Sequence, residues 1–86
     1  MKKIVAIIQP FDAMQNLYAY ENGNKIGSER CQINNIPQGI LDATKKYDAE
    51  EIDLHGPIQF NRGLKKQIEL KEKLLYNNNE LKINLI

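Results

Sequence analysis

The run KIVAIIQ, from Lys3 to Gln9, is β-branched and apolar and does not alternate with polar residues. Such a run is typical of a strand covered on both faces, because a strand with one wet face alternates between apolar and polar residues. We therefore expect it to be the central strand of a sheet. A chain of 86 residues buries only one small core, so we expect a single domain over residues 1–86.

A β-hairpin is predicted after this strand. Residues 17–21 and 25–33 form two strand-like segments on either side of the pair Asn22-Gly23. The pair favours a type I′ turn, because both central residues of that turn adopt positive φ. The hairpin would add two strands beside the central one.

The middle of the chain carries signals for a helix and then a fourth strand. Asn34 or Asn35 is a suitable N-cap, Pro37 fits the first turn, and apolar residues at helical spacing continue to about Tyr47. The segment Ile52–His55 then predicts a short strand, since its apolar residues alternate with polar ones.

A second helix and a fifth strand complete the pattern. The helical periodicity runs from Asn61, as its N-cap, to Tyr76. The residues predicted to face inward are Leu64, Ile68, Leu74 and Leu75. The last segment, LKINLI at residues 81–86, alternates in the way typical of a strand with one solvated face.

Together these segments predict the order β-β-β-α-β-α-β. A hairpin followed by two right-handed crossover units places five strands in a single mixed sheet with helices on its faces. We expect the strand order 3-2-1-4-5, with the second strand antiparallel to the rest. The fold class is therefore α/β.

Two stretches resemble proteins of the ribonuclease H-like fold, which actin-like ATPase domains share. IVAIIQPFDAMQNLYAYENGNKI is similar to the opening of RuvC-type resolvases, sugar-kinase-like proteins and tRNA-threonylcarbamoylation proteins. KKYDAEEIDLHGPIQFNRGLKKQIE is similar to their later segment, in which a strand ends in an acid or a Gly-Pro turn before a helix. The resemblance implies a ribonuclease H-like fold.

The chain departs from this family where its nucleases bind metal. In those nucleases an acid at the end of the first strand and another at the end of the fourth hold two magnesium ions. The first position here is Gln9, whose amide lacks the charge that holds a dication, and the second is near Asp53 or His55. Asp12, three residues beyond Gln9, is poorly placed as a substitute. The resemblance thus implies a non-catalytic module with no catalytic residue, metal or cofactor.

A second resemblance covers the first strand alone. MKKIVAIIQPF is similar to the first strand of PII nitrogen-signalling proteins. Those proteins continue into an amphipathic helix, whereas this chain continues after Phe11 into an Asn-Gly hairpin. The ribonuclease H-like resemblance covers more of the chain and so predicts the fold.

The stretch DLHGPIQFNRGLKK, residues 53–66, contains the best candidate binding site. Open α/β sheets bind ligands at the carboxyl ends of their strands, and free N–H groups at a helix start suit a phosphate or carboxylate. The predicted anion-binding residues are His55, Arg62, Lys65 and Lys66. The residues predicted to line the same crevice are Gln9, Asp12 and Asp53. A purely structural role also fits, since a Gly-Pro pair breaks a strand and lysines commonly form the wet face of a helix.

Composition narrows the class of protein. The net charge of +1 excludes a strong overall field, so nucleic-acid binding requires a local basic patch. One cysteine, Cys31, with one histidine can form neither an intramolecular disulfide nor a zinc site. The apolar run that starts at Ile4 is too short for a secretory signal or a membrane span, so we expect a cytoplasmic protein without membrane contact.

Two functions fit these observations. The first is protein–protein association, with a homodimer through the edge strand at residues 81–86 as the simplest form, in a small phage or mobile-element accessory protein. The second is nucleic-acid or nucleotide-phosphate binding by a relic nuclease that uses the anion-binding residues. Tyr18 and Tyr20 share one strand face and fit either function, covered by a partner or as a platform on which bases stack.

Overall fold

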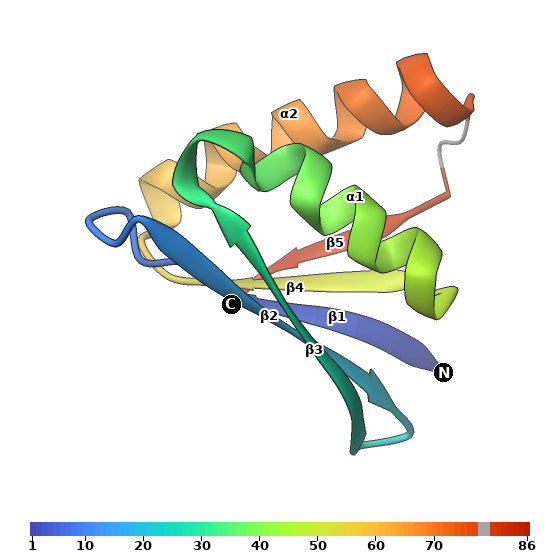
Figure 1. Cartoon of the computed structure of the whole chain (residues 1–86). Coiled ribbons are helices and arrows are strands. Elements are labelled where there is room, and N and C mark those ends of the chain that lie inside the picture. Colours follow the sequence, from blue (N-terminus) through green and yellow to red (C-terminus); the bar gives the residue numbers. More distant parts are fainter. Residues whose placement is uncertain (78–79) are drawn as a thin grey trace.

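The computed structural model describes residues 1–77 and 80–86 and contains one sheet and two α-helices (Figure 1). The elements in chain order are β1 (Lys2–Ile7), β2 (Met14–Glu21), β3 (Asn24–Gln32), a 3₁₀ turn η1 (Ile33–Asn35), α1 (Ile36–Tyr47), β4 (Glu51–His55), α2 (Ile58–Tyr76) and β5 (Lys82–Leu85). The predicted order β-β-β-α-β-α-β is confirmed.

The sheet has the strand order β3-β2-β1-β4-β5, as predicted. β2 pairs antiparallel with both β1 and β3, whereas β1–β4 and β4–β5 are parallel pairs. The hairpin turn between β2 and β3 has positive φ at Asn22 (51°) and Gly23 (85°). The Asn-Gly pair therefore provides the backbone freedom that its position requires.

Both helices lie on the same side of the sheet and contact each other (Figure 1). The sequence predicted helices on the faces of the sheet without assigning a side to each. The crossovers from β3 to β4 and from β4 to β5 step in the same direction across the sheet. Because both are right-handed, they place their helices on one face.

The hydrophobic core lies between this face of the sheet and the two helices. Ile4 and Ala6 of β1 are completely buried there. Further core residues include Leu17, Ile40, Leu41, Ile52, Leu54 and Ile68. Val5 and Ile7 point to the opposite face and are half-buried. The expectation that β1 is covered on both faces is therefore wrong for the described part of the chain, although β1 is the central strand.

The second helix begins earlier than the sequence predicted. α2 starts at Ile58, with Pro57 as its N-cap, and the backbone N–H of Asn61 donates to the Pro57 carbonyl oxygen at 3.0 Å. Proline is tolerated at a helix start because its missing N–H would have had no intrahelical partner. Asn61 is consequently inside the helix and only 1% exposed, so its assignment as the N-cap is wrong.

The far end of α2 also differs from expectation. Leu64 and Ile68 face inward as predicted, but Leu74 and Leu75 are 73% and 55% exposed. A helix of 19 residues is about 28 Å long, whereas the five-residue strand β4 beneath it spans only about 17 Å. The last turns of α2 therefore extend beyond the sheet. Among the described residues, neither helix has the length and apolar content needed to cross a membrane.

Candidate functional site

The turn that follows β1 is held by a side chain that sequence analysis missed. Gln15 is 1% exposed; its Oε1 accepts from the Gln9 backbone N–H at 2.6 Å, and its Nε2 donates to the Gln9 carbonyl at 2.8 Å. The same Nε2 donates to the Asp12 carbonyl at 2.9 Å. The Gln9 and Asp12 side chains are exposed. The backbones of both residues are held by the buried side-chain amide of Gln15. The signal available in the sequence was a glutamine at an inward-facing position of β2.

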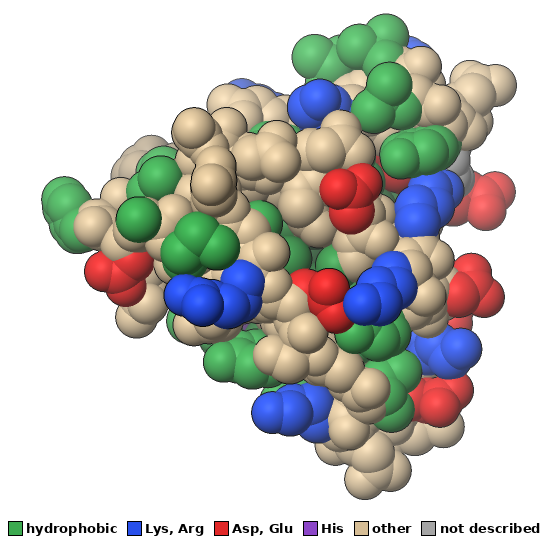
Figure 2. Space-filling model, viewed as in Figure 1, with side chains coloured by type: hydrophobic (Ala, Val, Ile, Leu, Met, Phe, Trp, Pro, Cys, Tyr) green, Lys and Arg blue, Asp and Glu red, His purple; other side chains and the backbone are tan. Residues whose placement is uncertain are grey.

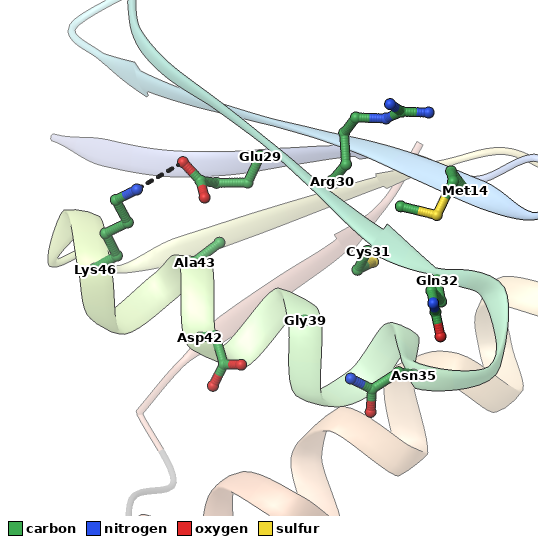
Figure 3. Close-up of a pocket in the computed structure, with 10 residues that line it drawn as sticks. All are labelled: Met14, Glu29, Arg30, Cys31, Gln32, Asn35, Gly39, Asp42, Ala43 and Lys46. Atoms are coloured by element: carbon green, nitrogen blue, oxygen red, sulfur yellow. Dashed lines mark hydrogen bonds and ion pairs between the residues drawn. The ribbon is translucent and has the colours of Figure 1, made fainter.

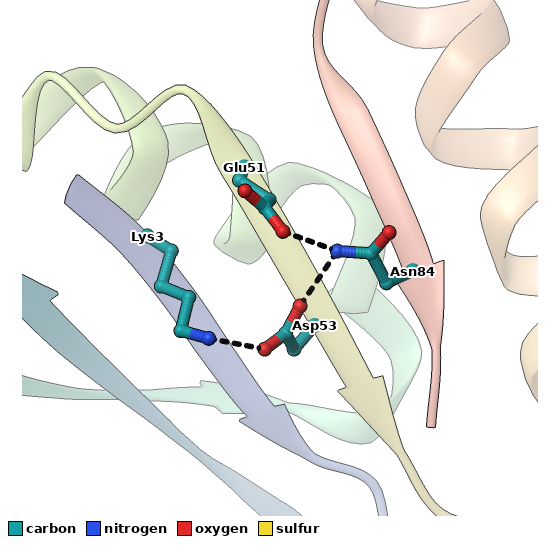
Figure 4. A network of polar contacts seen from close by, with 4 residues as sticks. All are labelled: Lys3, Glu51, Asp53 and Asn84. Atoms are coloured by element: carbon teal, nitrogen blue, oxygen red, sulfur yellow. Dashed lines mark hydrogen bonds and ion pairs between the residues drawn. The ribbon is translucent and has the colours of Figure 1, made fainter. Parts of the chain in front are cut away.

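Asp53 lies at the centre of a polar network on the sheet face opposite the helices (Figure 4). Lys3 Nζ lies 2.9 Å from Asp53 Oδ2, and Asn84 Nδ2 donates to Asp53 Oδ1 at 2.9 Å. Asn84 Nδ2 also donates to Glu51 Oε2. Figure 4 shows Lys3 and Asn84 reaching Asp53 from the strands on either side of β4. The network thus ties β1, β4 and β5 together.

Protonation in this network follows from its contacts. Burial alone would raise the pKa of Asp53, but the hydrogen bonds from Asn84 and Lys3 and the charge of Lys3 outweigh burial and lower it below its ordinary value of 3.8. The hydrogen bond to Asp53, followed by the attraction of its charge, raises the pKa of Lys3 above 10.5. Both groups are therefore charged at neutral pH.

The structure separates Asp53 from the other predicted crevice residues. In the β1–β4 register, Val5 lies opposite Asp53 and Ile7 lies opposite His55. Gln9 follows two residues after Ile7, so it is displaced from Asp53 by four residues, or about 13 Å along the strand direction. Gln9 and Asp12 are near the carboxyl end of β1, whereas Asp53 is in the middle of its strand.

The predicted anion-binding residues lie on both sides of the junction between β4 and α2. The His55 carbonyl accepts from the Ile8 N–H at 2.8 Å, and strand alternation places the His55 side chain on the same face as Asp53. Arg62, Lys65 and Lys66 lie together on one side of α2, which packs on the other face of the sheet. The three cations are thus brought together, and His55 is not one of their group.

Gly56 is required at this junction for two reasons. Its φ is +141°, and a Cβ built there would lie 2.5 Å from the Ile8 carbonyl oxygen. The same Cβ would lie 3.3 Å from Asn61 Nδ2, so the buried Asn61 amide sits directly beneath the turn. Neither Nδ2 nor Oδ1 of Asn61 has a hydrogen-bond partner within the described residues.

A groove between α1 and β3 was not predicted (Figure 3). The groove is open to solvent and has a volume of about 360 Å³, and Cys31 and Gly39 are among its lining residues. At one end Lys46 Nζ donates to Glu29 Oε2 at 2.9 Å, and Tyr47 OH donates to the same oxygen at 2.7 Å. The hydrogen bonds from Lys46 and then Tyr47 lower the pKa of Glu29, so the groove ends in a satisfied ion pair.

In the described ranges, no three side chains of the types that ligate metals lie close enough together to hold an ion. No family model and no curated protein matches the sequence. A solved structure from Bacteroides thetaiotaomicron, described as a protein with an actin-like ATPase fold and unknown function, is similar to this chain with a TM-score of 0.68 and 18% identity. The chain has the actin-like, ribonuclease H-like fold.

The same comparison limits what can be concluded about this chain from the similarity. The match covers 99% of this chain but 32% of the solved one, so the chain spans about a third of the length of the protein it resembles. At 18% identity the similarity shows the ribonuclease H-like architecture and no activity.

Proposed function

We propose that this chain is a small, non-catalytic ribonuclease H-like module that acts by protein–protein association, and that its first partner is a second copy paired through β5. The observation that carries the proposal is the edge of the sheet at β5. One side of β5 pairs with β4, and the other side has no strand partner among the described residues. Such edges recruit further strands through their unpaired N–H and C=O groups.

The backbone contacts of β5 indicate which of its N–H groups are available to pair with another strand. The N–H of Lys82 donates to the Glu50 carbonyl at 3.3 Å, and that of Ile86 donates to the Leu54 carbonyl at 2.9 Å. Because successive residues alternate, the N–H groups of Ile83 and Leu85 point away from β4. Two copies related by a twofold axis would pair these groups in an antiparallel ladder and join the two sheets.

The Asp53 network supports the non-catalytic part of the proposal. Both carboxylate oxygens of Asp53 accept bonds from Lys3 and Asn84. A metal ion at Asp53 would have to displace a lysine charge and an amide, and it would gain no charge from Gln9. The carboxylate is therefore best explained as a link between strands.

The uncovered face of the sheet supports association. Val5, Ile7, Tyr18 and Tyr20 are half-buried on this face, although no described helix covers it. Apolar and aromatic side chains grouped on a sheet face favour burial under a partner. A dimer through β5 would place the two uncovered faces side by side as one wider surface.

Sedimentation velocity over a range of micromolar concentrations tests the proposal. We expect the unmodified chain to sediment increasingly as a dimer as concentration rises. The variant Leu85→Pro removes an outward N–H that makes no internal bond, so it should fold and remain a monomer.

Ser28→Pro is the matched control on the opposite edge. The Ile33 N–H donates inward to the Ala13 carbonyl, and alternation then directs the Ser28 N–H outward from β3. This variant should dimerise as the unmodified chain does. A constant monomer mass for the unmodified chain, or loss of the dimer in Ser28→Pro alone, would refute pairing through β5.

Anion binding at the start of α2 is a second candidate function. The Pro57 N-cap makes no side-chain hydrogen bond and the first turn of α2 contains no acid, so its N–H groups can bind an anion beside Arg62. A relic nucleic-acid site predicts oligonucleotide binding that weakens steeply with salt and is lost in Arg62→Ala with Lys65→Ala. Titrations that stay flat at low salt would remove this candidate.

A further inference from the structure

α2 carries a second apolar stripe in addition to its buried one. The buried side of the helix consists of Asn61, Leu64, Ile68 and Glu72. Phe60, Leu70 and Leu74 lie outside that side and are 40%, 58% and 73% exposed. Figure 2 shows hydrophobic side chains gathered over the end of α2 at the upper right, with basic side chains beside them. The exposed stripe cannot be explained by the core.

The spacing of the stripe is that of a helix–helix seam. Phe60, Gly63, Gln67, Leu70 and Leu74 follow one another at intervals of three, four, three and four residues. Side chains at this spacing form one continuous line along a helix and interlock with a similar line on a second helix. We name these five residues the α2 seam.

Gly63 provides a second, independent indication that a helix packs along the α2 seam. A Cβ built at Gly63 meets nothing within 4 Å, so no group of the described chain requires a glycine there. Glycine in a helix interior is unfavourable relative to alanine. A glycine in the middle of an exposed apolar line lets the backbone of a second helix approach closely.

The charges beside the seam indicate the chemistry of its partner. Lys66 and Lys73 flank the seam on one side, and Lys71 flanks it on the other, where Lys71 Nζ donates to Gln38 Oε1 at 3.4 Å. A second copy of α2 would bring lysines against lysines in either orientation. A helix whose flanking positions are acidic would instead form ion pairs on both sides.

We propose that the α2 seam binds an amphipathic helix of a partner protein in which Asp and Glu border the apolar line. Gln67 and Gly63 interrupt the apolar surface, which favours a matching helix over insertion into a lipid surface. This site lies on α2 and does not depend on pairing at β5. The Leu85→Pro variant keeps the seam and should bind equally well.

Fluorescence anisotropy with a labelled peptide tests the seam. The probe is a helical peptide about three heptads long, with Leu at its a and d positions and Glu at its e and g positions. We expect saturable binding that Leu70→Ser with Leu74→Ser weakens about tenfold or more. Both side chains are mostly exposed, so the double variant should remain folded, which circular dichroism checks.

Three further comparisons define the result. Phe11→Ser removes a fully exposed aromatic side chain from the β1–β2 turn and should leave peptide binding unchanged. Gly63→Ala should raise the melting temperature and yet weaken binding, a combination that nonspecific adhesion would not produce. A peptide with Lys in place of every Glu should bind much more weakly.

Three outcomes would overturn the proposal. The first is an acidic peptide that fails to bind, or that binds the double leucine variant as tightly as the unmodified chain. The second is co-sedimentation with vesicles of phosphatidylcholine and phosphatidylglycerol that the double variant abolishes, because the seam would then contact lipid. The third is self-association that the double variant abolishes, because its partner would then be a second copy.

Discussion

Asp53 shows how a carboxylate within a sheet is held by side chains from the neighbouring strands. Its carboxylate is nearly buried, yet its pKa is lowered because Asn84 and Lys3 supply the hydrogen bonds and the opposite charge. The partners are separated from it by 31 and 50 residues in the sequence, so no local pattern predicted them. The sequence predicted that Asp53 lines a crevice because of its position in the strand. Its actual contacts depend on the register of three strands, which the sequence pattern does not show.

Neutralising Asp53 should change the response of the protein to acid. Because the folded pKa of Asp53 lies below its ordinary value, the charged form stabilises the fold above about pH 4, and this contribution is lost as the pH falls through the folded pKa. Asp53→Asn should lower the free energy of unfolding at neutral pH by about 1 kcal/mol, since Lys3 is partly exposed and its charge is screened. The variant should also lose less stability between pH 7 and about pH 3.

Urea unfolding at several pH values measures both effects. Asp12→Asn is the matched control, because the Asp12 side chain is exposed and has no hydrogen bond or ion pair in the described structure. It should retain the acid dependence of the unmodified chain. If Asp53→Asn lost as much stability between pH 7 and about pH 3 as the unmodified chain, the network would not stabilise the Asp53 charge as described.

Asn61 is a residue whose polarity costs stability. Its two side-chain polar atoms are buried without partners in the described structure, and such groups cost about 1–3 kcal/mol each. Asn61→Ala should therefore change the free energy of unfolding by less than about 1 kcal/mol, because relief of this cost offsets the lost packing. Leu64→Ala, one turn further along the same buried side, should cost about 2–5 kcal/mol. Equal losses in the two variants would indicate that Asn61 has a partner.

At the scale of elements, the sequence was most informative where a pattern is local. Strand and helix order follow from apolar periodicity, and the Asn22-Gly23 turn follows from its need for positive φ. The start of α2 was missed because Pro57 caps it, although Asn61 is the better capping residue by type. The prediction that Leu75 faces inward was wrong because periodicity shows the side of a helix and not where the sheet beneath it ends. The prediction for Leu74 was wrong because Leu74 lies outside the buried side of α2.

The two glycines within helices should respond oppositely to alanine. A Cβ at Gly39 of α1 would lie 2.4 Å from the Cys31 Cβ, whereas a Cβ at Gly63 of α2 meets nothing within 4 Å. Gly39→Ala should lower the free energy of unfolding by about 1–3 kcal/mol through overpacking. Gly63→Ala should raise it by about 0.5–1 kcal/mol through better helix propensity. Thermal and urea unfolding measure both, and a stabilising Gly39→Ala would contradict the close packing of α1 on β3.

At the scale of the whole molecule, chirality and short connections were enough to predict the sheet. The right-handed crossover rule leaves few topologies for this order of elements, and the observed order is the predicted one. The same rule also places α1 and α2 on one face, which leaves the other face without a described cover. The candidate surfaces could not be predicted in this way. They depend on which sheet face and edge no other element covers, and on where α2 extends beyond the end of the sheet.

Hydrogen exchange of individual backbone amides, measured by NMR at low and high protein concentration, tests pairing through β5 most directly. The outward amides of Ile83 and Leu85 should exchange freely in the dilute monomer and become protected as the concentration rises. The outward amide of Ser28 on the opposite edge should exchange rapidly at both concentrations. If the β5 amides stay unprotected at concentrations where the protein sediments as a dimer, the copies associate through another surface and the proposed role of β5 is contradicted.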